Sequence, residues 1–223
     1  MKNKLAILTA CLVVASPLFA QEREDRRLAD SAKVLQAIMG GDRGLPTNVL
    51  QQSYCVLVYP SVKKVAVGIG GTYGRGVLVC RKGATMNEGW GAPAMYSLDV
   101  GSLGVQLGST VTDFVIAIAS EKAANQVIDG KTKLGANASA AAGPTGAQGT
   151  DYKSQAEELT YSRTKGVFAG VSLAGATIDT DKDANKKVYG KEIGTREILT
   201  SESVPSAAQP LVSLLDKTSP TRP

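Results

Sequence analysis

The chain has 223 residues, of which 43% are hydrophobic and 20% are charged. This composition is ordinary for a globular protein and excludes a disordered chain. Histidine is absent, which excludes Ser-His-Asp and Cys-His catalysis and most catalytic zinc sites. The 24 glycines and the low aromatic content of 5% instead favour a glycine-rich β protein with tight turns.

The N-terminus has the pattern of an export signal. Lys2 and Lys4 precede an uncharged run over residues 5–20, and charged residues crowd the segment that follows. As a helix this run would reach about 24 Å, short of the roughly 30 Å hydrocarbon core, so cleavage after Ala20 is favoured over a retained anchor. The bulky Leu18 next to the cleavage point keeps the retained anchor as an alternative.

Cys11 offers a second export route, because residues 8–11 resemble a bacterial lipoprotein box in which the cysteine would carry the lipid. Either route would place the mature protein in the periplasm or at the outer membrane. Loss of Lys2 and Lys4 would leave 23 basic against 20 acidic residues, a net charge of +3. That charge is too small to indicate a nucleic-acid binder.

Cys55 and Cys80 remain after export, and each lies in an apolar, strand-like run. An oxidising compartment permits a disulfide between them, and two buried free thiols are the equal alternative. We expect no metal site, since neither cysteine has a histidine or another cysteine nearby.

The first part of the mature chain is predicted to be helical. Apolar residues recur at helical spacing over residues 26–39, charged residues occupy the other arc, and Gly40 ends the segment. This pattern predicts an amphipathic helix. Leu45 and Pro46 then begin a short helical piece that ends near Gln52.

The remaining chain is predicted to be mostly β-structure with short helices between the strands. Strands are expected at residues 54–59, where Pro60 stops the first, and at 65–73, 77–81, 95–108, 111–119 and 131–142, with a hairpin of 157–163 and 166–178. Helices are expected at 120–128 with Ser120 as N-cap, at 181–189 before Gly190, and at 195–201. Residues 204–223 form a proline-punctuated tail with at most one short helix at 211–216, and we expect this tail to fray at its end.

These elements predict a single α+β domain. Its antiparallel sheets would curl around an apolar interior in a barrel- or sandwich-like arrangement, with short flanking helices and the N-terminal amphipathic helix. The sequence contains no linker long enough to separate two domains. We therefore expect a signal at 1–20, one domain at 21–203 and the tail at 204–223.

Several phrases of the sequence, rather than one catalytic motif, resemble the SYLF domain family of lipid-binding modules. The clearest phrase spans residues 161–173. The others are Leu45, Pro46 and Leu50, residues 56–60, the glycine-rich residues 67–77, the tryptophan–proline turn at 90–94, and Gly104, Gln106, Gly108 and Asp113. The resemblance covers about residues 28–200 and departs at Cys55, Met95 and Ala174, where the family often has glycine, an aromatic and an acidic residue respectively.

The resemblance implies binding of anionic phospholipid without catalysis, since eukaryotic members bind phosphoinositides. Some of those members act at actin-rich membranes beside a peptide-binding domain. Because the export signal of this chain looks bacterial, we expect neither phosphoinositide nor actin as its partner. A phospholipid of the cell envelope agrees better with an exported bacterial protein than a phosphoinositide does.

Membrane attachment combines basic groups near anionic headgroups with apolar side chains at the acyl boundary. The candidate lipid-binding residues are Arg26, Arg27, Lys33, Lys63, Lys64, Arg75, Arg163 and Lys165. The candidate membrane-inserting residues are Leu28, Leu35, Ile38 and Trp90. The alternative is that the apolar helix stripe packs on the sheet and that Trp90 fills the core.

Two other functions remain open. Strand faces that carry glycine in place of larger side chains, together with the apolar strands, could form the interfaces of a homo-oligomer. Such an oligomer would have a structural role in the envelope and would bind no specific lipid. An enzyme would need a carboxylate pair from Asp99, Asp113 or Glu157, and nothing in their spacing identifies one. We therefore expect a non-enzymatic protein with no cofactor, no metal and no nucleic-acid partner.

Overall fold

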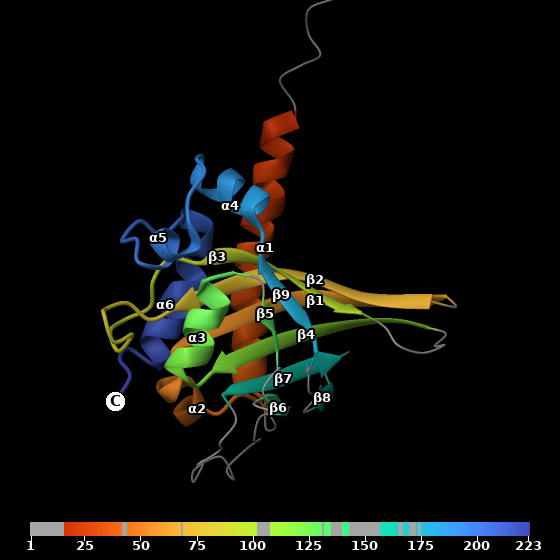
Figure 1. Cartoon of the computed structure of the whole chain (residues 1–223), viewed down its shortest axis with the longest axis horizontal. Coiled ribbons are helices and arrows are strands. Elements are labelled where there is room, and N and C mark those ends of the chain that lie inside the picture. Colours follow the sequence, from red (N-terminus) through yellow and green to blue (C-terminus); the bar gives the residue numbers. More distant parts are fainter. Residues whose placement is uncertain are drawn as a thin grey trace, which may run out of the picture.

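The computed structural model describes residues 16–41, 44–67, 69–101, 108–130, 132–134, 140–142, 157–164, 167–169, 173 and 175–223 (Figure 1). Residues 1–15, which hold most of the predicted signal and Cys11, lie outside this description, as does Lys165. The described elements form one α+β domain on a curled, largely antiparallel sheet. This confirms the predicted fold class, with one continuous sheet in place of several.

The nine strands described form a sheet in the order β5-β9-β3-β2-β1-β4-β7-β6, with β8 paired to β7. Neighbouring strands are antiparallel except for the parallel pair β6 and β7. The strands are β1 Cys55–Val67, β2 Ile69–Cys80, β3 Ala94–Gly101, β4 Gly108–Ile118, β5 Thr132–Lys133, β6 Ala140–Ala142, β7 Glu158–Thr164, β8 Val167–Ala169 and β9 Thr177–Thr180.

Helices cover both faces of the sheet (Figure 1). Helices α1 (Ser16–Met39) and α6 (Gln209–Thr218) lie on one face, which we call the α1 face. Helices α3 (Glu121–Ile128) and α5 (Thr195–Leu199) lie on the other, and α4 (Lys182–Tyr189) packs against both α1 and β3. Because both faces are covered, the central strands are apolar on both sides.

The amphipathic helix is longer than predicted, and its apolar stripe packs on the sheet. After the helix, the backbone at Gly44 passes so close to α1 that a Cβ there would lie 1.7 Å from the carbonyl oxygen of Ile38. Only glycine permits this contact, which turns the chain into helix α2 (Thr47–Gln52).

Pro60 does not stop the first strand, contrary to our prediction. Strand β1 continues to Val67 through a bulge, where its register with both β2 and β4 shifts. Ser61 adopts a positive φ of 55° in this bulge and donates its backbone N–H to Oδ1 of Asp113 at 2.9 Å. A proline is tolerated here because a bulge leaves a residue outside the ladder of hydrogen bonds.

The bulge also changes which side chains face α1. Before it, Val58 packs in the core under α1 and Tyr59 in the opposite core. After it, Val62 lies in the opposite core, so alternation along the strand turns Lys63 to the α1 face and Lys64 away from it. This placement of Lys63 is the main consequence of the bulge for the site described below.

Local signals predicted the ends of α3 and α4 correctly. The Ser120 side chain accepts a hydrogen bond from the N–H of Ala123 at 3.1 Å, and Asp181 accepts one from the N–H of Ala184 at 3.1 Å. Gly190 follows α4 with a φ of +70°, the left-handed conformation of a helix C-terminus.

The C-terminal segment is part of the core, so the prediction that it frays is wrong. A short 3-10 turn (Ser206–Ala208) leads into α6, which packs on α1. Leu211 and Leu215 are fully buried in the core of the α1 face, and Ser219 is also buried. These contacts are with residues far away in the sequence, which is why the local pattern did not reveal them.

Arg81 fixes this C-terminal segment to the sheet. Its buried guanidinium donates five hydrogen bonds, to the carbonyl oxygens of Gln51, Ser53, Glu88 and Ser219 and to the hydroxyl of Ser219. It also stacks 4.4 Å from the centre of the Trp90 ring. Burial lowers the pKa of Arg81 to about 10, so the group remains charged at neutral pH.

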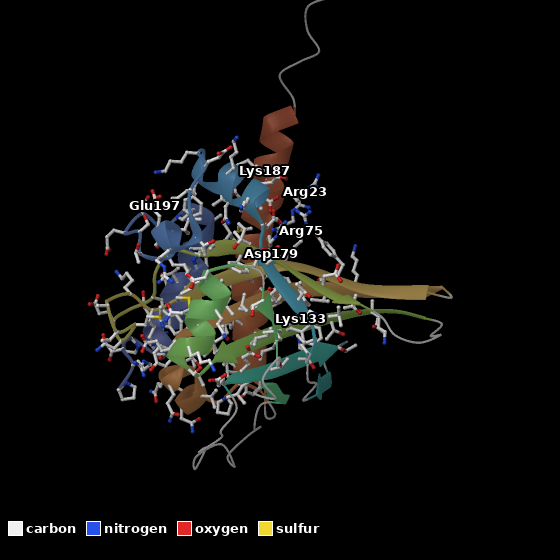
Figure 2. All side chains as sticks on the ribbon, in the orientation of Figure 1. Arg23, Arg75, Lys133, Asp179, Lys187 and Glu197 are labelled. Atoms are coloured by element: carbon white, nitrogen blue, oxygen red, sulfur yellow. A yellow bond between two sulfur atoms is a disulfide. The ribbon has the colours of Figure 1, made fainter. Side chains whose placement is uncertain are left out.

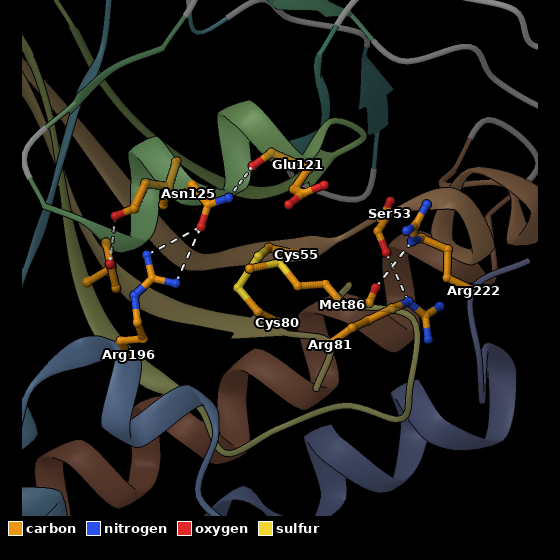
Figure 3. Close-up of a disulfide and its surroundings, with 11 residues drawn as sticks. Ser53, Cys55, Cys80, Arg81, Met86, Glu121, Asn125, Arg196 and Arg222 are labelled. Atoms are coloured by element: carbon orange, nitrogen blue, oxygen red, sulfur yellow. Dashed lines mark hydrogen bonds between the residues drawn. A yellow bond between two sulfur atoms is a disulfide. The ribbon is translucent and has the colours of Figure 1, made fainter. Parts of the chain in front are cut away.

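A disulfide joins Cys55 and Cys80, which lie directly opposite each other at the base of the β1–β2 hairpin (Figure 3). The structure thus contains a bridge and not two free thiols. Both residues are buried in the core opposite α1.

We expect the double substitution Cys55→Ala and Cys80→Ala to lower the free energy of unfolding by about 3 kcal/mol, because the bridge closes a loop between residues 25 apart in sequence. Urea unfolding measures this change. Dithiothreitol should lower the urea midpoint of the unsubstituted protein and leave that of the double variant where it is. A double variant as stable as the unsubstituted protein would contradict a stabilising bridge.

Candidate functional site

A cationic recess lies between the N-terminal half of α1 and strands β1 and β2, at the bulge around Pro60. It encloses about 320 Å³. It is lined by Arg23, Arg26, Arg27, Asp30, Pro60, Ser61, Lys63, Tyr73, Gly74 and Arg75. We call it the arginine groove. Five of these residues are cationic and one is acidic, so the recess suits an anionic ligand.

The local structures explain why these side chains converge. Arg23, Arg26, Arg27 and Asp30 are spaced three and four residues apart, which places them on one face of α1. On β2, Tyr73 and Arg75 alternate with Gly74 and therefore point to the same face of the sheet. Lys63 lies directly opposite Tyr73 in the register of β1 and β2. Figure 2 shows Arg23 and Arg75 near one another where α1 meets β2.

Arg27 is the buried base of the groove. Its side chain is only 8% exposed and forms ion pairs with Glu24 at 2.7 Å and with Asp181 at 3.4 Å. Burial lowers the pKa of Arg27, and the two carboxylates oppose that change. Since Asp181 is also the N-cap of α4, Arg27 connects α1 to α4 and holds the groove wall in place.

Arg75 forms the exposed side of the groove. It is 44% exposed, forms an ion pair with Asp181 at 3.1 Å, and donates a hydrogen bond from Nε to the hydroxyl of Tyr73. The hydrogen bond to Tyr73 raises the pKa of Arg75, and the charge of Asp181 adds to the effect. The guanidinium is therefore oriented by two partners and still faces solvent.

Arg23 and Lys63 have no ion-pair partner among the residues that the structure describes. Arg26, in contrast, pairs with Glu22 in a solvent-exposed contact at 3.0 Å, and Asp30 pairs with Lys33. Exposed pairs of this kind are weak and exchange readily. An incoming phosphate would therefore meet two unpaired cations and two oriented guanidinium groups, which bind phosphate in a bidentate way.

The groove gathers half of the predicted lipid-binding residues, namely Arg26, Arg27, Lys63 and Arg75. The other described candidates lie outside it. Lys64 points to the opposite face of the sheet, and Arg163 on β7 pairs with Asp113 at 2.8 Å. Lys33 lies further along α1 with an exposed side chain.

The predicted membrane-inserting residues are buried, so that prediction is wrong for the folded protein. Leu28, Leu35 and Ile38 are fully buried beneath α1 and cannot reach a membrane. Trp90 is 2% exposed and donates its ring N–H to the carbonyl oxygen of Ser219 at 2.9 Å. In both cases the alternative reading, packing in the core, is correct.

Sequence reasoning missed Arg23 and Tyr73. Arg23 precedes Arg27 by four residues, so the helical period points to it, but the predicted helix began only at residue 26. Tyr73 precedes Arg75 by two residues in a strand, and this alternation places both on the same face. One more helical turn before Arg27 and one more strand alternation before Arg75 would have identified both residues.

A second, larger cavity of about 810 Å³ is lined by four acidic and three basic side chains and is therefore a weaker candidate for an anionic ligand. Its charged lining consists of Asp129, Asp179, Lys182, Asp183, Lys186, Glu192 and Arg196. Two ion pairs already neutralise part of this set, Lys186 with Glu192 at 2.9 Å and Arg196 with Asp129 at 2.7 Å.

In the part of the chain that the structure describes, no cluster of three or more cysteine or acidic side chains could hold a metal ion. None of the helices described there combines the length and the apolar character that crossing a bilayer requires.

The fold and the groove together define a single α+β domain with a cationic recess at one face of its sheet. Residues 99–218, more than half of the chain, match the Ysc84 family, which is described as "Las17-binding protein actin regulator". The chain belongs to this family, which is the SYLF domain family that the sequence phrases resemble.

Three relatives illustrate the match. The SH3 domain-containing protein PJ696.02 of Schizosaccharomyces pombe is 36% identical over 80% of this chain and 42% of its own length. Protein YSC84 of Saccharomyces cerevisiae is 32% identical over 83% of this chain and 42% of its own length. The human SH3 domain-containing YSC84-like protein 1 is 30% identical over 79% of this chain and 52% of its own length.

The chain thus spans about two fifths to one half of these relatives. Their names mention SH3 domains, and the family description mentions Las17 binding and actin regulation.

Proposed function

We propose that this protein binds anionic phospholipid at a membrane surface through the arginine groove and catalyses no reaction. The observation that carries the proposal is the charge of the groove, where five cationic side chains surround a recess that contains one carboxylate, Asp30. Arg23 and Lys63 are available for a ligand, because no carboxylate among the described residues pairs with them.

The expected binding free energy and the volume of the groove support this proposal. A basic side chain near an anionic membrane surface contributes about 1 kcal/mol to binding. Three exposed groove cations, Arg23, Lys63 and Arg75, would then contribute about 3 kcal/mol, or roughly a hundredfold in affinity. The groove volume of about 320 Å³ also falls within the range of small-molecule sites and would accept one headgroup.

The ion pairs with Asp181 make the groove a preformed site. Arg27 and Arg75 share the carboxylate of Asp181, which holds both guanidinium groups against α4. Because these cations are ordered before a ligand arrives, binding loses little side-chain entropy. Neutral lipids lack the net negative charge that this arrangement favours.

We also propose that the protein acts outside the cytoplasm, after export by residues 1–20. The disulfide between Cys55 and Cys80 supports this, since structural disulfides persist mainly in oxidising compartments. Cleavage after Ala20 would leave α1 beginning at Gln21 and would keep every groove residue of the helix. An anionic phospholipid of the cell envelope is then the ligand.

Co-sedimentation with vesicles tests the proposal. We expect the protein to partition about a hundredfold better onto phosphatidylcholine vesicles containing phosphatidylglycerol than onto vesicles of phosphatidylcholine alone. Added salt should reduce the difference, because exposed charges are screened. Equal partition onto the two kinds of vesicle, or none onto either, would refute the proposal.

A second candidate function follows from the family description, which names Las17 binding and actin regulation. Co-sedimentation with actin filaments in the absence of lipid separates the two candidates. Our proposal expects the protein to stay in the supernatant. Saturable binding to filaments, together with failure to bind anionic vesicles, would favour the actin-linked function instead.

A further inference from the structure

Two large hydrophobic side chains are exposed in the described part of the chain, and they lie on either side of one lysine of the sheet. Tyr73 on β2 is 46% exposed and Val111 on β4 is 48% exposed. Each is directly opposite Lys63 of β1, which lies between them. Residues opposite each other in an antiparallel sheet share a face and approach within about 5 Å, so the three side chains form one continuous patch.

This patch lies on the α1 face and adjoins the arginine groove. Tyr73 and Lys63 line the groove itself. Strands β1, β2 and β4 continue past α1 in Figure 1, and Val111 lies next to Lys63 on the side away from Tyr73. The patch is therefore an exposed extension of the groove floor.

The charges around the patch indicate which kind of partner surface it can bind. Lys63 lies at its centre, and Arg75 follows Tyr73 on the same face. Asp99 on β3 is opposite Tyr73 on its other side and marks the edge of the patch. An apolar pair with one cation between its members and another beside it is complementary to the boundary between anionic headgroups and acyl chains.

We propose that Tyr73 and Val111 form an interfacial anchor that enters the headgroup region of an anionic bilayer while the arginine groove holds a headgroup. The inference rests on the proposed function and adds the apolar contact that the buried α1 stripe cannot supply. The phenol of Tyr73 has an apolar ring and a polar end, a combination that membrane interfaces favour. Lys63 extends its apolar stem between the two side chains and keeps its ammonium group at the phosphates.

The opposite face of the same strands provides a matched control. Thr72 and Thr110 flank Lys64 there, just as Tyr73 and Val111 flank Lys63. The two sets are adjacent in sequence and carry the same charge, but only one adjoins the groove. A non-specific interaction of charge with the vesicle would not distinguish them.

The first test places a fluorescent probe in the anchor. Tyr73→Trp introduces a tryptophan at the patch, and the native Trp90 is buried and serves as background. With phosphatidylglycerol-containing vesicles that carry brominated phosphatidylcholine, we expect a blue shift and quenching of the introduced tryptophan. No quenching in a variant that does bind the vesicles would overturn the anchor.

The second test removes the apolar contact. The double substitution Tyr73→Ser and Val111→Ser should weaken partition onto the same vesicles about tenfold at fixed salt, whereas Thr72→Ser and Thr110→Ser should leave it unchanged. Far-ultraviolet circular dichroism and urea midpoints establish that both variants remain folded. Equal partition of the two double variants would overturn the anchor.

The outcomes separate this inference from the proposed function. If the unsubstituted protein fails to bind anionic vesicles, the proposed function fails. If it binds and the Tyr73 and Val111 variants bind equally well, the anchor alone fails. A second copy of the chain is the other partner that the patch could bind, and light scattering tests for it. If the unsubstituted protein is an oligomer and the double substitution Tyr73→Ser and Val111→Ser dissociates it, the patch is an interface between copies and the anchor is overturned.

Discussion

Substituting Arg81 by methionine is expected to lower the free energy of unfolding by about 3 kcal/mol, one of the largest effects of any single substitution in this chain. The guanidinium donates five hydrogen bonds, and methionine can replace none of them. The carbonyl oxygen of Ser53 would lose the Arg81 bond inside the protein. An unpaired buried carbonyl costs about 1–3 kcal/mol.

The same substitution is expected to loosen the C-terminus. Arg81 contacts both the carbonyl oxygen and the hydroxyl of Ser219, and Trp90 supports the same carbonyl. With Arg81 absent, the segment after α6 should become protease-sensitive, because fewer contacts keep it closed. Arg81→Lys should restore the protein only in part, since one ammonium group cannot reach acceptors in so many directions.

Urea unfolding and limited proteolysis measure these effects, and Lys82→Met is the matched control. Lys82 is the next residue and pairs with Glu202 in a largely exposed contact, so its substitution should change stability by less than about 1 kcal/mol. Equal stability of Arg81→Met and Lys82→Met would contradict the role assigned to Arg81.

Neutralising Arg23 and Arg75 together should weaken binding to anionic vesicles about thirtyfold, because each cation contributes about 1 kcal/mol near the surface. The two residues approach the groove from different elements, α1 and β2. Tyr73 and Asp181 also hold the guanidinium of Arg75 in place. Arg23→Gln with Arg75→Gln therefore removes both walls of the site without changing its volume greatly.

The fold should survive this change. Arg75 is half-exposed, and loss of its ion pair with Asp181 should cost less than about 1 kcal/mol. Lys122→Gln with Lys217→Gln is the control, because it removes the same charge from α3 and α6, away from the groove. Vesicle titration compares the two double variants. Similar losses in both would mean that net charge, not the groove, drives binding.

Local sequence signals predicted the elements whose ends depend on neighbouring residues. Ser120 caps α3 and Gly190 ends α4 as expected, because their hydrogen bonds and backbone conformations involve residues only a few positions away. The charged arc of α1 was also visible in the sequence, and it supplied Arg26 and Arg27 to the groove.

Features that depend on distant contacts were not predictable in this way. The bulge at Pro60 is stabilised by Asp113, which lies on another strand. The position of Lys63 in the groove depends on that bulge, since one extra residue exchanges the two faces of a strand. The buried C-terminal segment depends likewise on Arg81, 138 residues away from Ser219 in sequence.

The apolar stripe of α1 shows why amphipathicity alone did not identify the membrane contact. A helix with one apolar face buries it either in a core or in a membrane, and the sequence pattern is the same in both cases. The strands of the sheet supplied the partner for Leu28, Leu35 and Ile38. Tyr73 and Val111 are the large hydrophobic side chains left exposed in the described part of the folded chain, which is why the proposed anchor uses them.

The most direct test of the arginine groove compares two neighbouring lysines of β1. Lys63 and Lys64 have the same charge and point to opposite faces of the sheet, and only Lys63 lines the groove. On anionic vesicles, Lys63→Gln should weaken binding about fivefold, whereas Lys64→Gln should leave it unchanged. Equal binding by the two variants would contradict the assignment of the lipid site to this groove.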